Sequence, residues 1–220
     1  MAERSVQIAP AVLAATPAQY EHDLQVATSV SSHIQIDVAD GQFAPNRTVN
    51  LEQTYWPEQV RADIHVMYND PASHLETLVA LGPHLAIIHF ESEGLSEEQL
   101  RDMSTQLRAV GVQFGLALLP PTPVEAVHGL MSEIDHALIF TGELGHYGGE
   151  MQAQCLNKIG QLKQLQPDME VGVDGGIDDT NVAAVVRSGA DVLNVGSYIQ
   201  RASRPQEAYA TLQNIISDVT

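Results

Sequence analysis

The chain has 220 residues, of which 44% are hydrophobic and 17% are charged, and its formal net charge is −18. This size and composition suit one domain with a sizeable buried core, so we expect residues 1–220 to form a single domain. The 28 acidic residues against 10 basic ones repel nucleic acid and anionic membrane surfaces, and neither is an expected partner.

The cysteine content, the N-terminal residues and the length of the apolar runs indicate the cellular compartment of the protein. Cys155 is the only cysteine, which excludes an intramolecular disulfide framework, and a structural thiol is the simplest interpretation of it. The N-terminal residues do not resemble a secretion signal, and no apolar run approaches the ~20 residues that cross a bilayer. These features predict a cytoplasmic protein that does not enter membranes.

Short apolar segments typical of buried parallel strands alternate with amphipathic segments typical of helices. The predicted strands are 6–13, 33–38, 62–66, 85–89, 113–118, 136–140, 170–173 and 192–195. The predicted helices include 17–29, 96–110, 151–165, 180–188 and 205–216. Gly111 and Gly189 stand where a left-handed residue would end a helix before the next strand.

Eight strand-helix repeats close most simply into a TIM (β/α)8 barrel, an α/β fold. The alternative, a doubly wound open sheet, would normally use fewer strands and a G-x-G-x-x-G turn after the first strand, which this sequence lacks. In a barrel the active site forms at the carboxyl ends of the strands, so polar residues there are the first functional candidates.

Three such residues are Asp37, His65 and Asp174, which end the second, third and seventh predicted strands. Two carboxylates and an imidazole that converge in one mouth can bind a divalent metal or transfer protons. Each could instead be structural, with Asp174, for example, accepting N–H bonds from the turn that follows it.

Glycine follows the last two strands, as Gly175-Gly176 and as Gly196-Ser197. Because the chain is so acidic, a phosphate site must rely on local backbone N–H groups, which these positions can supply. The alternative is that the glycines only make turns. The glycine-rich loop 141–150 could be a lid that contributes Gly145, Gly148 and Gly149 to the phosphate site, or an ordinary connection.

The motifs together resemble the ribulose-phosphate 3-epimerase family. They are the stretches 8–10, 36–46, 64–67, 173–176 and 189–192, in the family's order and spacing. The resemblance implies that Asp37 and Asp174 act as a general acid/base pair on opposite faces of C3 of a ketose phosphate. It implies interconversion of ribulose 5-phosphate and xylulose 5-phosphate, with Met67 as an apolar residue over the enediolate.

The resemblance also implies a divalent metal (zinc, manganese, iron or magnesium) that polarises the C2 carbonyl, with Asp37, His65 and Asp174 as three of its four ligands. The fourth position holds Gln35 where the family has histidine, and an amide oxygen is a far poorer zinc ligand. Ala11 replaces a serine near the substrate, and Glu150 replaces a neutral amide of the lid.

These departures leave alternatives open: a sugar-phosphate-binding homologue with impaired turnover, or an epimerase for another phosphorylated sugar. Schiff-base chemistry is disfavoured because no lysine precedes Lys158 and none ends a strand. The family often forms homo-oligomers, so the resemblance allows a homo-oligomer here, and the residues themselves leave the oligomeric state open. Apart from His65, the histidines are expected mostly on surfaces or in loops, with His89 lining the mouth and His146 in the lid.

Overall fold

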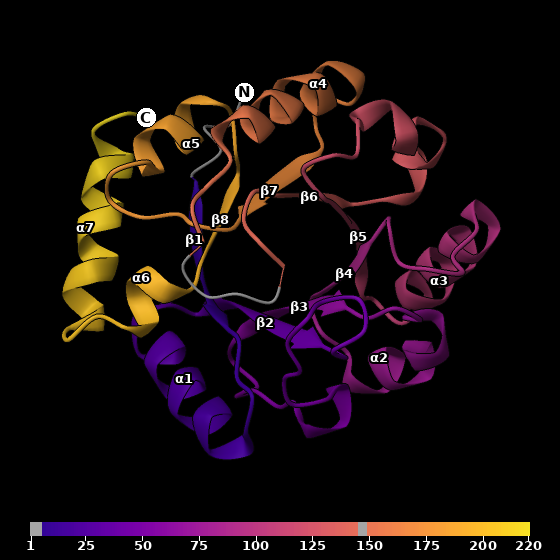
Figure 1. Ribbon diagram of the computed structural model, residues 1–220, viewed down its shortest axis with the longest axis horizontal. Coiled ribbons are helices and arrows are strands. Elements are labelled where there is room, and N and C mark those ends of the chain that lie inside the picture. The colour runs from indigo at the N-terminus through magenta and orange to yellow at the C-terminus, as the bar shows by residue number, and fades with distance from the viewer. Residues whose placement is uncertain (1–5, 145–148) are drawn as a thin grey trace.

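The computed structural model describes residues 6–144 and 149–220, whose eight parallel strands close into a barrel (Figure 1). The strands are β1 (Gln7–Val12), β2 (His33–Ala39), β3 (Arg61–Met67), β4 (Leu85–His89), β5 (Gln113–Leu118), β6 (His136–Phe140), β7 (Glu170–Asp174) and β8 (Val192–Val195). Each strand pairs with the next, and β8 pairs with β1. The predicted TIM barrel is confirmed, and every predicted strand boundary lies within one residue of the observed one.

Helices surround the barrel (Figure 1). They are α1 (Pro17–Val30), α2 (Leu75–Leu81), α3 (Glu97–Ala109), α4 (Asn157–Leu165), α5 (Val182–Arg187), α6 (Ser197–Gln200) and α7 (Pro205–Ser217), with 3-10 segments η1 (Leu51–Gln53), η2 (Ala72–His74), η3 (Val124–Glu133) and η4 (Ala153–Leu156). The predicted helix 151–165 is divided into η4 and α4, while α2, η3 and α6 were not predicted. These segments are short or carry proline nearby, so helical periodicity is weak in them.

Local sequence sets where several helices begin and end. The Thr16 side chain caps α1 by accepting the Gln19 N–H at 3.3 Å, and Pro17 occupies the first turn, where no N–H is needed. Ser96 and Gln99 form a reciprocal capping box at the start of α3. Gly111 and Gly189 have φ of +84° and +95°, which confirms their predicted left-handed conformation.

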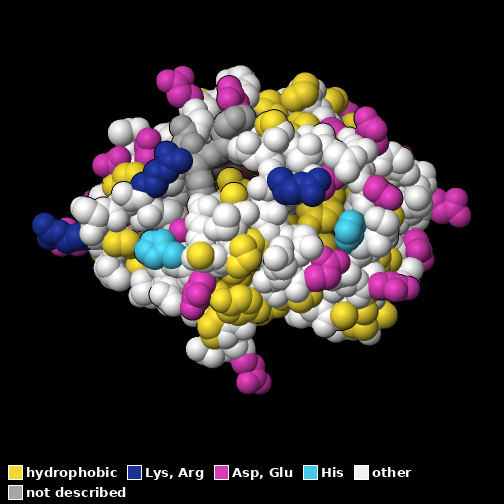
Figure 2. Space-filling model, turned by 60° about the horizontal axis from the view of Figure 1, so that its bottom comes forward, with side chains coloured by type: hydrophobic (Ala, Val, Ile, Leu, Met, Phe, Trp, Pro, Cys, Tyr) yellow, Lys and Arg dark blue, Asp and Glu magenta, His cyan; other side chains and the backbone are white. Residues whose placement is uncertain are grey.

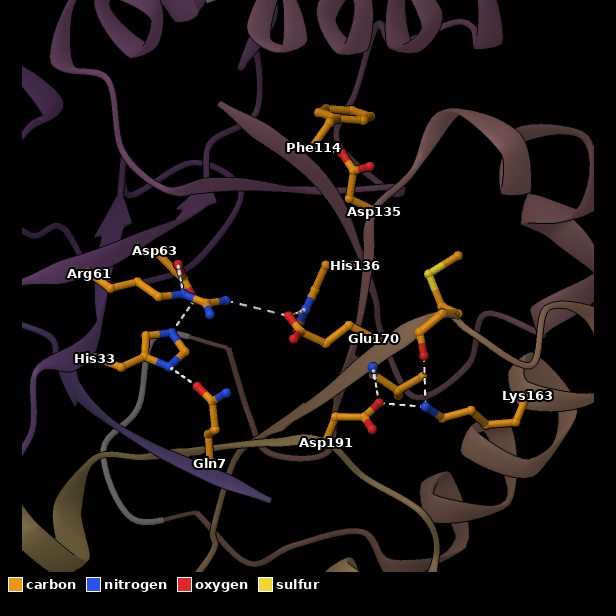
Figure 3. Close-up of polar contacts among 12 residues, drawn as sticks. Gln7, His33, Arg61, Asp63, Phe114, Asp135, His136, Lys163, Glu170 and Asp191 are labelled. Carbon is orange, nitrogen blue, oxygen red and sulfur yellow. Dashed lines mark hydrogen bonds and ion pairs between the residues drawn. The ribbon is translucent and has the colours of Figure 1, made fainter. Parts of the chain in front are cut away.

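A polar network closes the amino-terminal end of the barrel, opposite the strand ends expected to bear the site (Figure 3). His33 bonds to Asp63 at 2.6 Å and to Gln7 at 2.9 Å, and His136 bonds to Glu170 at 3.0 Å. The expectation of surface histidines is therefore wrong for His33 and His136, which are 7% and 1% exposed. Polar residues at the strand starts bond both ring nitrogens of His33 and the Nδ1 of His136, while the buried Nε2 of His136 has no partner among the described residues.

Acidic side chains are spread over the face of the molecule that Figure 2 draws. Figure 2 shows many acidic side chains and few Lys or Arg on the face drawn, in keeping with the net charge of −18. Among the described residues, no helix is long and apolar enough to span a membrane.

Candidate active site

A pocket opens at the carboxyl ends of the strands. The acidic and imidazole side chains expected there come together in it: Asp37 from β2, His65 from β3 and Asp174 from β7. The sheet register explains their proximity, because Asp37 and His65 are paired residues of neighbouring strands. The pocket is also lined by Ala11, Leu13, Met67, Phe140, Gly142, Glu143, Gly149, Gly175, Gly176, Ile177, Asn194, Gly196 and Ser197.

Gln35 joins the two carboxylates. Its Nε2 donates to Asp37 Oδ1 at 2.8 Å and to Asp174 Oδ2 at 2.6 Å, and the residue is fully buried. The His65 Nδ1 lies 3.0 Å from Asp37 Oδ1 and 3.6 Å from Asp174 Oδ2. The two acids therefore meet around shared donors, which holds their carboxylates in fixed positions.

Burial, and after it the neighbouring charge of Asp37, raise the pKa of Asp174 to about 7. Hydrogen bonds from Gln35 and the Gly175 N–H oppose the shift without cancelling it. Two carboxylates this close cannot both ionise cheaply, so the pair holds a proton near neutral pH. One acid can then donate a proton while the other accepts one.

The raised pKa of Asp174 predicts a pH-dependent cost in stability. In the unfolded chain this group loses its proton near its ordinary pKa of 3.8, whereas in the folded protein it keeps the proton until about pH 7. The free energy of unfolding therefore falls as pH rises through that window. We expect Asp174→Asn to remove this fall, so that thermal unfolding at pH 8 occurs above wild type by at least about 2–4 °C. An equal difference at pH 4 and pH 8 would contradict the prediction.

The Asp37, His65 and Asp174 ligand atoms lie within 4.8 Å of one another, a grouping that could hold a metal ion. The fourth position does not fit the family's ligand set. Gln35 presents its N–H₂ to the same carboxylate oxygens that a cation would use, and an N–H donor cannot be a ligand. The reverse orientation would set the amide oxygen against at least one ionised carboxylate, so the acids favour the orientation with the N–H₂ toward them.

His89 is a buried partner of the cluster, since its Nε2 lies 2.8 Å from the Nε2 of His65. Burial lowers the pKa of His89 to about 4, so its imidazole is neutral at pH 7. The residue is not among those that line the pocket, so the expectation that it lines the mouth is wrong. Its position at the end of β4 predicted that it faces the barrel interior. The sequence could not reveal its contact with His65.

The expected phosphate-binding residues Gly149, Gly175, Gly176, Gly196 and Ser197 all line the pocket. Gly175 and Gly176 also have steric reasons to be glycine. Their φ values are +112° and +71°, and a Cβ would lie 2.3 Å from Gly142 N or 2.4 Å from Gly149 O. The turn after β7 thus packs directly against the loop after β6, and these glycines are needed for that contact whether or not phosphate binds.

This packing predicts the effect of Gly176→Ala, which should displace the loop after β6 and weaken phosphate binding at least about tenfold. Gly111→Ala is a matched control, because Gly111 also has positive φ but a Cβ there would meet nothing within 4 Å. Both variants carry the backbone penalty of about 1–2 kcal/mol, and only the first disturbs the site. Calorimetric titration with inorganic phosphate would measure the difference. Equal affinities in the two variants would disprove the coupling.

The remaining predicted site residues either line the pocket or lie outside the described residues. Met67 lines the pocket, whereas Gly145, Gly148 and His146 lie outside the described residues. Among the pocket residues that sequence reasoning did not single out, Glu143 and Asn194 have polar side chains. Asn194 carried a usable signal, because a polar residue on a predicted barrel strand, two positions before Gly196, must face the interior if its apolar neighbours face the helices.

A closed (β/α)8 barrel with two acids joined at its carboxyl mouth defines a barrel enzyme equipped for acid–base chemistry. The sequence profile of the Ribulose-phosphate 3 epimerase family matches residues 7–200. The chain belongs to this family, and it is accordingly an enzyme of the isomerase class.

Named relatives cover nearly the whole chain. The ribulose-phosphate 3-epimerase of Schizosaccharomyces pombe is 30% identical over 217 residues, which are 96% of this chain and 93% of the relative. That of Treponema pallidum is 30% identical over 89% of this chain and 91% of its own length. Among solved structures, 3-hexulose-6-phosphate synthase from Salmonella typhimurium superposes with a TM-score of 0.73 over 98% of this chain and 100% of its own, at 14% identity. That likeness concerns the fold alone.

Proposed function

We propose that the chain interconverts the C3 epimers of a ketose phosphate, ribulose 5-phosphate and xylulose 5-phosphate, by proton transfer between Asp37 and Asp174. The observation that carries this proposal is the shared contact of both carboxylates with Gln35, at 2.8 and 2.6 Å, together with the pKa of Asp174 near 7. A pair that holds one proton can take a proton from one face of a carbon and return one to the other.

The reaction requires no net change in atoms. One carboxylate removes the C3 proton, which is acidified by the C2 carbonyl, and leaves an enediolate. The other carboxylic acid gives its proton to the opposite face of C3, and the configuration is inverted. The two acids end with exchanged protonation states, so proton exchange with solvent must restore them before another turnover in the same direction.

Phosphate would be held at the other end of the pocket. Gly175 and Gly176 after β7 and Gly196 and Ser197 at the start of α6 present backbone to the same space. No Lys or Arg is among the described residues that line the pocket, so backbone N–H groups are the donors available for the phosphate oxygens. This arrangement would fix the distance between the phosphate and the reacting carbon.

The family's divalent metal would supply Lewis-acid polarisation of the substrate carbonyl where it is bound. In this chain, we propose that Gln35 takes over one task of that metal, which is to hold the two carboxylates together. The amide neutralises part of their repulsion through its two N–H groups. A neutral amide stabilises an oxyanion less than a dication does, so turnover is expected to be slow.

The test is conversion of ribulose 5-phosphate in deuterium oxide by purified protein, with and without chelator, alongside elemental analysis. We expect xylulose 5-phosphate that carries deuterium at C3 and a rate that is unchanged by chelator. Loss of the activity with chelator would refute the role given to Gln35 but not the epimerisation. Binding of the sugar phosphate without deuterium incorporation would reject the proposed reaction and indicate a binding homologue or another substrate.

A further inference from the structure

Asn194 is a largely buried polar residue whose side chain lines the pocket. It is 3% exposed, lines the pocket, and its amide makes no hydrogen bond with any described residue. Its neighbours Leu193 and Val195 belong to the main hydrophobic core, so Asn194 points into the barrel. The amide atoms of Asn194 are not among the fully buried atoms that lack a partner, so they face the open pocket, where a bound molecule can hydrogen-bond to them.

The position of Asn194 on β8 limits which part of a substrate it can meet. It is paired with Asp174 in the register of β7 and β8, and it lies two residues before Gly196. It therefore lies beside Asp174 and next to the expected phosphate-binding turn at Gly196 and Ser197. Asp37 and His65 belong to β2 and β3, which lie on the other side of β1.

The opposite neighbour of Asn194, β1, supplies no polar side chain at this level. Ala9 is the paired residue of Asn194, and Ala11 is the next residue of β1 on the same face. Both are 2% exposed or less, and Ala11 stands where the family resemblance leads us to expect a serine hydroxyl. On this side of the pocket the alanines of β1 offer no hydrogen-bonding side chain. The amide of Asn194 is thus the group available to bind a substrate oxygen there.

We propose that Asn194 recognises the hydroxyl group on the substrate carbon between the reacting centre and the phosphate-bearing carbon, which is C4 of a pentulose 5-phosphate. The inference rests on the proposed function for the orientation of the substrate. A hydroxyl both donates and accepts a hydrogen bond, and an amide offers one group of each kind. Asn194 is then a specificity-determining residue that favours 4-hydroxylated sugar phosphates over analogues that lack this group.

The experiment compares two non-reacting ligands, ribitol 5-phosphate and its 4-deoxy analogue, by calorimetric titration of wild type and of Asn194→Leu. Leucine keeps the approximate shape of asparagine and removes its polar atoms. We expect wild type to prefer the hydroxylated ligand about tenfold, and Asn194→Leu to bind both with nearly equal affinity. Asn214→Leu, an exposed substitution on α7, is the control and should keep the wild-type preference.

Equal weakening of both ligands by Asn194→Leu, or an unchanged preference, would overturn the proposal. Unchanged ligand affinities with a loss of turnover would also overturn it, because Asn194 would then act on the enediolate. Since neither polyol can react, the preference can be measured even if ribulose 5-phosphate is not converted. Failure of the proposed function is therefore distinguishable from failure of this inference.

Discussion

Asp37→Asn and Asp174→Asn are each expected to lower the rate of epimerisation by at least about 10³-fold, because each substitution removes one of the two groups that move the C3 proton. The protein should remain folded, since asparagine keeps the size of the side chain and can still accept a hydrogen bond from Gln35. The coupled conversion of ribulose 5-phosphate and the thermal unfolding midpoint would measure these two effects.

The two variants should also fail in different ways. In deuterium oxide each retains one acid, so each should exchange the C3 proton of one epimer without forming the other, and the exchanged epimer should differ between the variants. Asp63→Asn is a control, because Asp63 is a buried carboxylate at the opposite end of the barrel and bonds to His33. Exchange of the same epimer by both variants would contradict a mechanism with one acid on each face.

The second large effect is expected in Gln35→His, which should bind about one equivalent of zinc per chain where the wild type binds little. Imidazole would replace the amide whose N–H groups bond to both carboxylates, and two His with two Asp make a tetrahedral ligand set. Elemental analysis after equilibration with zinc and dialysis would measure the stoichiometry, without depending on activity.

Gln35→Leu is the matched variant for this test. It removes the amide without adding a ligand, so any gain of zinc by Gln35→His alone must come from the imidazole. A wild-type protein that already retains one equivalent of zinc would show that the Gln35 amide turns its oxygen toward the ion. In that case the four residues of this chain would fit the family's metal after all.

The helical periodicity and the strand boundaries were largely readable from the sequence. Buried parallel strands are short apolar runs, and positive-φ glycines such as Gly111 and Gly189 end the helices between them, so local signals repeat at each unit of the barrel. The signals were weaker for α2 and η3, where short length and nearby proline leave little periodic pattern. Packing against the barrel, rather than local preference, decides those segments.

The identity of the main acid pair also came from sequence, because the carboxyl end of every barrel strand faces the same mouth. Asp37, His65 and Asp174 could be selected by this rule before any distance was known. Sequence could also show that Gln35 replaces a family histidine. It could not show which end of the amide faces the acids, because that depends on two carboxylates contributed by strands far apart in the chain.

Sequence by itself therefore determined the barrel, the order of its strands and the strand ends that carry the acids, since those follow from local patterns and from the symmetry of parallel strands. Only the tertiary structure decided the burial of His33 and His136, the contact of His89 with His65, and the position of the Asn194 amide in the pocket. The physical reason is that hydrogen-bond satisfaction and the pKa of Asp174 depend on groups brought together by closure of the barrel, and local sequence does not encode those distances.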